Sequence, residues 1–317
     1  MKRLKLGRES GIIAALILLV IIFSIINPIY ISSDNIVDII KQSTINGLLA
    51  IGITLAIITG GIDLSIGSIF AIVIVSIGKM LVAGLNPGLA FLLGTIFGFL
   101  MGLINGILIS KIKLQPFIAT LGTMSIYRGI AYIITGGWPV LDIPESFRKT
   151  LDGDIFGFIP SSVLLLLIVG IIMWIVLKYT RFGNYIYALG SNEEATRLSG
   201  VNVEFNKMLA YGFCGIGAAL AGMVLLARLG TGEPTAGQGY ELNAIAAAAV
   251  GGTSLIGGRG TIQGTILGTI LLSALRVGLI VVGVDSFWQY IATGIIIVIA
   301  ACFEIIQNKF SSVKFSK

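Results

Sequence analysis

The chain has 317 residues, of which 56% are hydrophobic and only 11% are charged, and its mean hydropathy is +1.01. A soluble protein does not carry repeated uncharged stretches of about 20 residues, so this composition excludes a soluble enzyme and indicates an integral membrane protein. The formal net charge is +6, and histidine is absent. The chain therefore lacks the commonest metal ligand and general base of proteins.

Apolar runs that are long enough to cross a bilayer follow one another along almost the whole chain. Spanning the hydrocarbon takes about 20 helical residues, and each span must be a helix because lipid offers the backbone no hydrogen-bond partner. We therefore predict an all-α polytopic membrane protein, with residues 1–317 forming a single transmembrane domain of about ten spans. The eighth run is short, so nine spans are the alternative. The predicted spans are 11–29, 43–60, 64–84, 88–110, 116–136, 160–178, 208–229, 241–257, 260–282 and 287–306.

The basic residues gather in loops that lie on one side of the membrane if the spans alternate in direction. This is the positive-inside pattern, which predicts that both termini and loop 179–207 are cytoplasmic and that loop 137–159 lies outside. The pattern accounts for the positive net charge without a nucleic-acid partner. The fourteen basic residues on the predicted cytoplasmic side are Lys2, Arg3, Lys5, Arg8, Lys111, Lys113, Lys178, Arg181, Arg197, Lys207, Arg259, Lys309, Lys314 and Lys317.

Two glycine-rich breaks separate neighbouring predicted spans. Each has a Gly-Gly pair followed by short polar side chains, which favours two related halves, and paired helix breaks of this kind mark the pathway in many transporters. We expect Leu at Gly61 or Gly252 to impair transport more than Leu at Gly98, which lies in a helix-packing ladder. The nearby run 257–260 reads as a tight turn. The candidate pathway residues are Gly60, Gly61, Asp63 and Ser65 in the first break, and Gly251, Gly252, Thr253 and Ser254 in the second.

Ionisable residues within predicted spans are functional candidates, because burying a charge in lipid is costly. Asp63 or Ser65 is suited to cap the helix that begins after the first glycine-rich break. The alternative for Asp63 is that it lines the pathway. Arg228 and Glu241 bracket a predicted outer loop over 229–240, where they either snorkel to the outer interface or serve the pathway.

Two further arginines lie deep within predicted spans. Arg128 lies about 18 Å along its span, and Arg276 lies well inside the ninth. Both are expected to face a partner helix or a water-filled cavity rather than lipid.

Motifs for covalent chemistry are absent from the sequence. There is no phosphate-binding P-loop and no serine triad, so we expect no catalytic residue, no cofactor and no metal in this chain. Cys214 and Cys302 lie in separate predicted spans, far apart in sequence, and are interpreted as packing residues.

A charged island over 190–201 interrupts the apolar sequence on the predicted cytoplasmic side. Asn192 is suited to cap a short helix, Glu193 and Arg197 have the spacing of a helical ion pair, and Gly200 is suited to end it. We interpret the island as a docking segment; the alternative is a solvated loop lying on the membrane surface. The candidate coupling residues are Gly190, Ser191, Asn192, Glu193, Glu194, Ala195, Arg197, Leu198 and Gly200.

Four long motifs resemble the permeases of ATP-binding-cassette sugar importers, in the ribose/xylose/galactose branch. They are ITGGIDLSIGS over 58–68, PFIATLGTM with RGIA over 116–131, the segment 183–201 around the island, and YELNAIAAAAVGGTSLIGGRGT over 240–261. The resemblance implies a permease in the cell membrane that pairs with a second copy, a cytoplasmic ATPase and an outer sugar-binding protein. It also implies that residues 190–200 form the helix that sits in the ATPase cleft.

Other transport functions remain open at this stage. An ion-coupled secondary transporter would depend on Asp63 or Glu241 for proton coupling, and a passive channel would need no partner. Within the importer family, ribose is the expected sugar, and another monosaccharide, a nucleoside or a furanosyl signal is the alternative.

Overall fold

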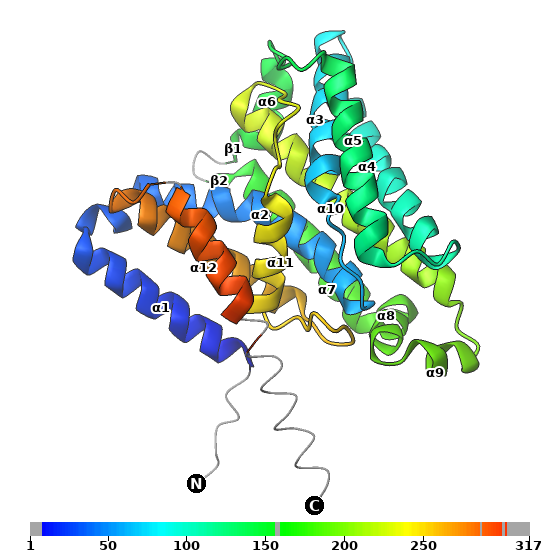
Figure 1. Ribbon diagram of the computed structural model, residues 1–317. Helices are drawn as coiled ribbons and strands as arrows, with labels where there is room; N and C mark the ends of the chain where they lie inside the picture. Colours follow the sequence, from blue (N-terminus) through cyan, green and yellow to red (C-terminus); the bar gives the residue numbers. More distant parts are fainter. Residues whose placement is uncertain (1–7, 156–158, 286, 300–301, 303–317) are drawn as a thin grey trace, which may run out of the picture.

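The computed structural model describes the chain except for residues 1–7, 156–158, 286, 300–301 and 303–317 (Figure 1). Six of the predicted cytoplasmic basic residues and the end of the tenth predicted span lie outside the described residues. Those basic residues are Lys2, Arg3, Lys5, Lys309, Lys314 and Lys317.

The described residues are mostly helical, which confirms the all-α polytopic fold. A two-residue antiparallel pair, β1 (Asp154–Ile155) with β2 (Ile159–Pro160), is the one exception among the named elements. The helices are α1 (Arg8–Ile26), η1 (Pro28–Ile31), α2 (Ser33–Ile58), α3 (Ile66–Val82), α4 (Pro87–Ser110), α5 (Pro116–Thr135), α6 (Glu145–Asp152), α7 (Ser161–Tyr179), α8 (Arg181–Ser191), α9 (Glu193–Leu198), α10 (Val203–Leu229), α11 (Tyr240–Val250) and α12 (Ile262–Val281).

Six helices are long and apolar enough to cross a membrane, namely α2, α4, α5, α7, α10 and α12. Four shorter apolar helices correspond to the remaining predicted spans: Ser10–Ile26, Ile66–Val82, Tyr240–Val250 and Phe287–Ile299. The predicted count of about ten spans is therefore not confirmed, although each predicted run contains an apolar helix.

Polar residues and prolines at the helix starts define these boundaries. The side chains of Ser32, Asn86 and Thr261 accept hydrogen bonds from backbone N–H groups in the first turns of α2, α4 and α12. Proline follows the cap of α4 and of α5, where its missing N–H would have no helical partner. Gly230 ends α10 in the left-handed conformation, with φ of 68°.

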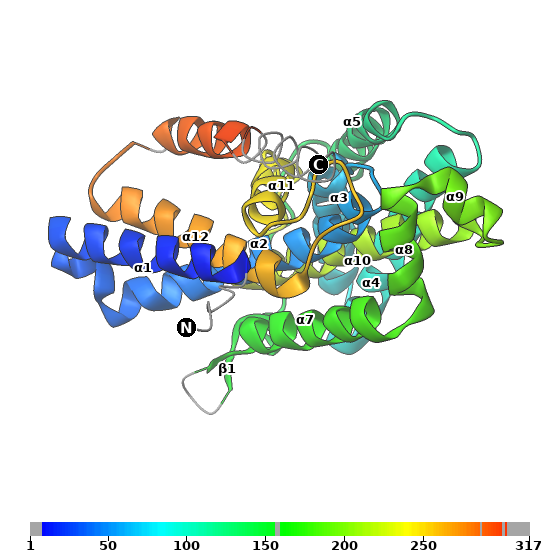
Figure 2. The ribbon, with the colours of Figure 1, turned by 90° about the horizontal axis from the view of Figure 1, so that it is seen from below.

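The centre of the bundle is formed by α2 and α10, which the other helices surround (Figure 2). Close approach of α4 to α10 depends on small residues. A Cβ at Gly98 would collide with Ala219 and the carbonyl of Gly215, and a Cβ at Gly102 would collide with the carbonyl of Tyr211. The predicted glycine ladder on α4 therefore packs helix against helix, as such spacing does in membranes.

The predicted spans 43–60 and 241–257 have the wrong bounds. Helix α2 starts at Ser33, capped by Ser32, so its polar first turns belong to the same helix as its apolar part. Helix α11 stops at Val250, where Gly251 and Gly252 follow, and its 11 residues extend only about 16 Å, too short to cross a bilayer.

The two long polar loops lie at opposite ends of the bundle, as the predicted topology requires. Loop 137–159 contains α6, which lies near the top of Figure 1 with β1 below it, whereas α8 and α9 of loop 179–207 lie at the lower end (Figure 1).

Candidate functional site

The charged island folds as the end of α8 followed by the short helix α9. Asn192 separates the two helices, and its Oδ1 accepts a hydrogen bond from the backbone N–H of Ala195 at 2.9 Å. Gly200 follows the helix in the left-handed region, with φ of 82°. The predicted cap and glycine stop are therefore present, while Gly190 and Ser191 belong to the last turn of α8.

Charged side chains fix α9 to the start of α10. Glu193 accepts hydrogen bonds from Arg197, at 3.1 Å and four residues on, and from Lys207 on α10, at 2.5 Å. Partial burial raises the pKa of Glu193, but the hydrogen bonds and charges of Lys207 and Arg197 outweigh it, so the net pKa lies below its ordinary value. Because Lys207 is mostly buried, the island is tied to the bundle rather than floating beside it.

Helix α8 meets the end of α2 and the glycine-rich run 257–260, at a contact that we call the joint (Tyr187, Gly190, Ile58, Gly258 and Gly260). The N–H of Gly258 donates to the carbonyl of Ile58 at 2.9 Å, which connects the end of α2 to the loop before α12. Gly190 lies on this pair so closely that a Cβ would collide with both atoms. The Tyr187 hydroxyl donates to the carbonyl of Gly260 at 2.7 Å.

The joint lies next to the two glycine-rich breaks, but only some of the candidate pathway residues take part in it. Gly60 packs beside Gly257 in the joint region, whereas Gly252 faces open space and Gly251 packs against Gly264 of α12. Thr253 packs against Gly260. The contact therefore uses the run 257–260, which was interpreted as a simple turn. Its dense glycine content was the available signal.

Asp63 organises the start of α3 and is fully buried. Its Oδ1 accepts hydrogen bonds from the N–H of Ser65, at 2.9 Å, and from the Ser65 hydroxyl, at 2.7 Å. Asn105 of α4 donates to both carboxylate oxygens, at 3.3 and 3.2 Å. Ser65 is the N-cap residue of α3 but makes no side-chain hydrogen bond to the first turn, so Asp63 holds the turn before the helix rather than capping the helix itself. Sequence reasoning missed Asn105.

Arg128 holds an irregular segment inside the bundle. Its guanidinium donates to the carbonyls of Pro234, Ala236 and Gly67 at 2.6, 2.7 and 3.0 Å. Arg128 lies about 10 Å from the end of α5 at Thr135, so the part of 230–239 that it binds descends to this depth. The start of the segment stays beside loop 137–159, where Gly232 pairs with Val140. Backbone carbonyls without helical partners are tolerated at such depth only where the protein satisfies them, which is what the guanidinium does.

The descent of 230–239 also places Glu241 deep in the bundle. Its Oε1 accepts a hydrogen bond from the N–H of Gly239 at 3.2 Å, and Arg128 and Glu241 line the same hollow beside α5. This position beside Arg128 favours the pathway interpretation of Glu241 over the interfacial one. Arg228, in the last turn of α10, pairs with the exposed Asp38 of α2 at 3.5 Å.

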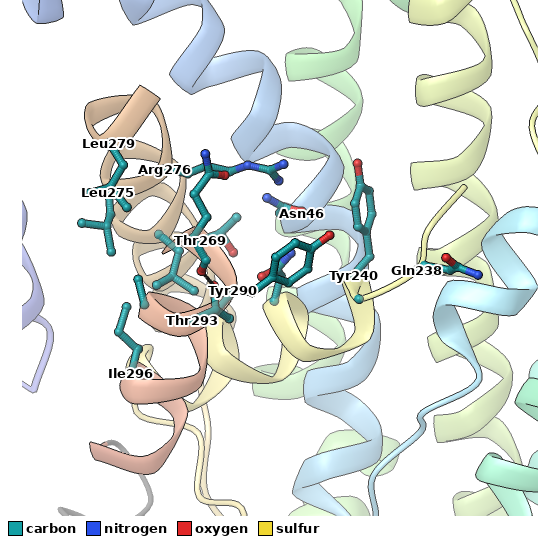
Figure 3. A pocket seen from close by; sticks show the side chains of 16 residues that line it. Asn46, Gln238, Tyr240, Thr269, Leu275, Arg276, Leu279, Tyr290, Thr293 and Ile296 are labelled. Atoms are coloured by element: carbon teal, nitrogen blue, oxygen red, sulfur yellow. Dashed lines mark hydrogen bonds between the residues drawn. The ribbon is translucent and has the colours of Figure 1, made fainter. Parts of the chain in front are cut away.

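Arg276 lines a cavity of about 110 Å³ between α2, α11, α12 and the helix Phe287–Ile299 (Figure 3). Asn46, Tyr240 and Tyr290 reach the same cavity from three other helices (Figure 3). As expected from the sequence, Arg276 faces a cavity between helices.

Nothing in the described part of the chain forms a metal centre. No group of three or more His, Cys, Asp or Glu side chains comes together there. Among those residues, Cys214 is buried and Cys302 is exposed, and both are free thiols.

Known proteins resemble this chain along almost its whole length. Residues 35–301 match the family described as the permease component of branched-chain amino acid transport systems. The ribose import permease protein RbsC of Bacillus subtilis is 43% identical over 94% of this chain and 92% of its own length. RbsC of Escherichia coli K12 is 39% identical, over 95% and 94%. The galactose/methyl galactoside import permease MglC of Escherichia coli K12 is 33% identical, over 94% of each. No solved structure matches the chain.

Proposed function

Because this chain belongs to the family of branched-chain amino acid transport system permease components, and is the permease subunit of an ATP-binding-cassette monosaccharide importer, we propose that the sugar it passes is ribose. The family implies an ATPase and a sugar-binding protein as partners, with the chain in the cell membrane. Support for ribose comes from the identity to two ribose permeases, which exceeds the identity to the galactose relative.

The joint is the observation that carries the proposed mechanism. We propose that the ATPase docks on α9 and that its movement reaches the membrane helices through α8. Gly190 contacts the main chain of Ile58 and Gly258 directly, with no flexible side chain between, and such contacts suit a segment that transmits displacement. The Glu193 contacts with Arg197 and Lys207 support this role because they hold α9 in one orientation.

A second copy of the chain is the proposed partner at the side of α5. The hollow beside α5 is lined by Ser125, Arg128, Gln238 and Glu241, and lipid would leave such polar groups poorly solvated. Apolar side chains such as Ile126 and Ile133 flank it and are exposed. A homodimer packed along α5 would cover the hollow and place a polar path between the copies.

The proposed orientation puts α8 and α9 in the cytoplasm and α6 outside. Single cysteines at Asp152 and Glu194, in a variant lacking Cys214 and Cys302, test it with a membrane-impermeant thiol reagent. Asp152→Cys is expected to react in intact cells and Glu194→Cys only after lysis. External labelling of both positions would refute the topology.

Reconstitution tests the function directly. The permease, its ATPase and its sugar-binding protein are placed in proteoliposomes, and uptake of labelled ribose, galactose and allose is measured with and without ATP. Ribose uptake that requires ATP and the binding protein is the expected result. Uptake that follows a proton or sodium gradient without ATP would show an ion-coupled transporter, and equal leakage of all sugars would show a channel.

A further inference from the structure

The cavity at Arg276 is partly open, lies between four helices and the end of segment 230–239, and is more polar than packing between membrane helices requires. Besides Asn46, Tyr240 and Tyr290, its lining includes Asn243 of α11 and Gln289. Its volume of about 110 Å³ exceeds the roughly 10–15 Å³ that one buried water needs, so it has room for a polar solute.

Several of these polar groups lack partners. Within the described residues, the side chains of Asn46, Asn243 and Arg276 make no hydrogen bond or ion pair. Asn46 is only 6% exposed, and its Oδ1 is buried without any donor. An unpaired buried amide oxygen costs about 1–3 kcal/mol, and an unpaired arginine inside a membrane costs more. Water or a polar ligand must therefore satisfy them.

The composition of the lining selects the class of ligand. No aspartate or glutamate lines the cavity, and its one charged group is Arg276, which disfavours a metal cation or a coupling ion. Amide and guanidinium groups beside tyrosine rings suit a neutral polyhydroxylated molecule, whose hydroxyls donate and accept and whose C–H faces pack on aromatic rings.

Gln238 connects this cavity with the hollow beside α5, because it lines both. We propose that the cavity is a second, protomer-internal site that holds a neutral monosaccharide during transport, contacted by Asn46, Asn243 and Arg276. This inference rests on the proposed function, since the ligand is the transported sugar. The site is separate from the path proposed between two copies.

Transport stoichiometry provides the first test. Asn46→Leu and Arg276→Gln are compared with Thr95→Val, a change on α4 remote from both cavities, in proteoliposomes containing the ATPase and the binding protein. The sugar carried per ATP hydrolysed is expected to fall at least about fivefold in the first two variants and to stay unchanged in Thr95→Val. An unchanged ratio in both cavity variants would overturn the internal site.

Protection of a lining cysteine tests occupancy without depending on transport. Thr293→Cys, in a variant lacking Cys214 and Cys302, is labelled with a thiol reagent in the purified full-length permease. Millimolar ribose is expected to slow labelling at least about threefold, and Asn46→Leu should abolish the protection. Protection by inorganic phosphate alone would reveal an anion site, and no protection by either solute would exclude a ligand. Either result overturns the proposal.

The two tests separate this inference from the proposed function. If the unmodified permease shows no ATP-dependent ribose uptake, the proposed function fails, whatever the cysteine result. If the uptake is normal and both cavity tests are negative, only the internal site fails.

Discussion

The joint at α8 and the cavity at Arg276 are opposite in construction. At the joint, backbone atoms of Ile58, Gly190 and Gly258 meet without intervening side chains, and the neighbouring charges of α9 are paired. In the cavity, side chains from four helices surround open space, and the amide oxygen of Asn46 has no partner.

The difference indicates two separate roles. Tightly packed backbone contacts transmit displacement from one element to the next, because a packed interior has little free volume to absorb it. Unpaired polar groups around space accommodate a mobile solute, which must bind weakly enough to leave. Arg128 combines features of both regions. It is a charged side chain inside the bundle, but its guanidinium is bonded to carbonyls of segment 230–239 and so holds that segment in place.

Adding a side chain at the joint is the strongest way to break this comparison. Gly190→Leu has no room beside the Ile58 carbonyl and the Gly258 amide, and we expect ATP-driven uptake to be abolished. Gly11→Leu on α1, where a Cβ meets nothing within 4 Å, is the matched control and should transport normally. Uptake is measured at equal amounts of protein in the membrane. Normal uptake by Gly190→Leu would mean that the backbone around Ile58 and Gly258 can move to accommodate the side chain, which contradicts a rigid joint.

Removing the guanidinium of Arg128 should have the next largest effect. Arg128→Leu leaves three carbonyls without a charged donor, and each such bond contributes about 1.5–3 kcal/mol. Uptake is expected to fall about 10- to 100-fold, whereas Arg128→Lys, which keeps the charge, should recover part of it. Proteolysis within 230–239 should increase in the Leu variant. Unchanged proteolysis within 230–239 in the Leu variant would show that other contacts hold this segment in place.

Two further glycines distinguish packing from pathway. For Gly252 the geometry argues against the order expected from the sequence, because Gly98 is enclosed by α10 while Gly252 faces open space. A Cβ at Gly61 would collide with the Tyr211 hydroxyl, so the expectation for Gly61→Leu stands. Gly98→Leu should lower the amount of folded protein. Gly252→Leu should cost only about 1–2 kcal/mol, from its left-handed backbone conformation. Thermal unfolding of both variants in detergent gives the comparison, and a more stable Gly98→Leu variant would contradict it.

The smallest expected effect is a pH dependence at Glu193. Because its folded pKa is depressed, its ion pairs stabilise α9 above the unfolded pKa, and the stabilisation is lost as the pH falls through the folded value. The protection factors of amides 193–198, which compare their hydrogen-exchange rates with those of an unstructured chain at the same pH, should be constant between about pH 7 and 5 and should fall only below the usual glutamate pKa of about 4.3. Glu193→Gln should show no such step. A step near neutral pH would mean that Glu193 has the opposite shift.

The sequence was sufficient for the regular and local features. Apolar runs predicted the helices because lipid forces the backbone to satisfy itself, and Asn192 with Gly200 predicted the limits of α9 because caps act within a few residues. The segment 230–239 was beyond such reasoning. Its placement depends on Arg128, about a hundred residues earlier, and its polar sequence is typical of an outer loop. The joint likewise depends on the fit of Gly190 to distant backbone atoms. The sequence marked Gly190 as a coupling candidate and 257–260 as rich in glycine, but neither pattern indicates that the two segments meet.

Charge reversal on α9 tests the central claim most directly. In Glu193→Lys with Glu194→Lys, positive charge replaces negative charge in the first helical turn, opposing the helix dipole and breaking the contacts with Arg197 and Lys207. Glu145→Lys on α6, an exposed ion-paired glutamate at the other end of the bundle, is the control. We predict that the double variant loses at least about 90% of both the co-purified ATPase and ribose uptake, while the control keeps both. Normal ATPase association with normal uptake in the double variant would contradict the account.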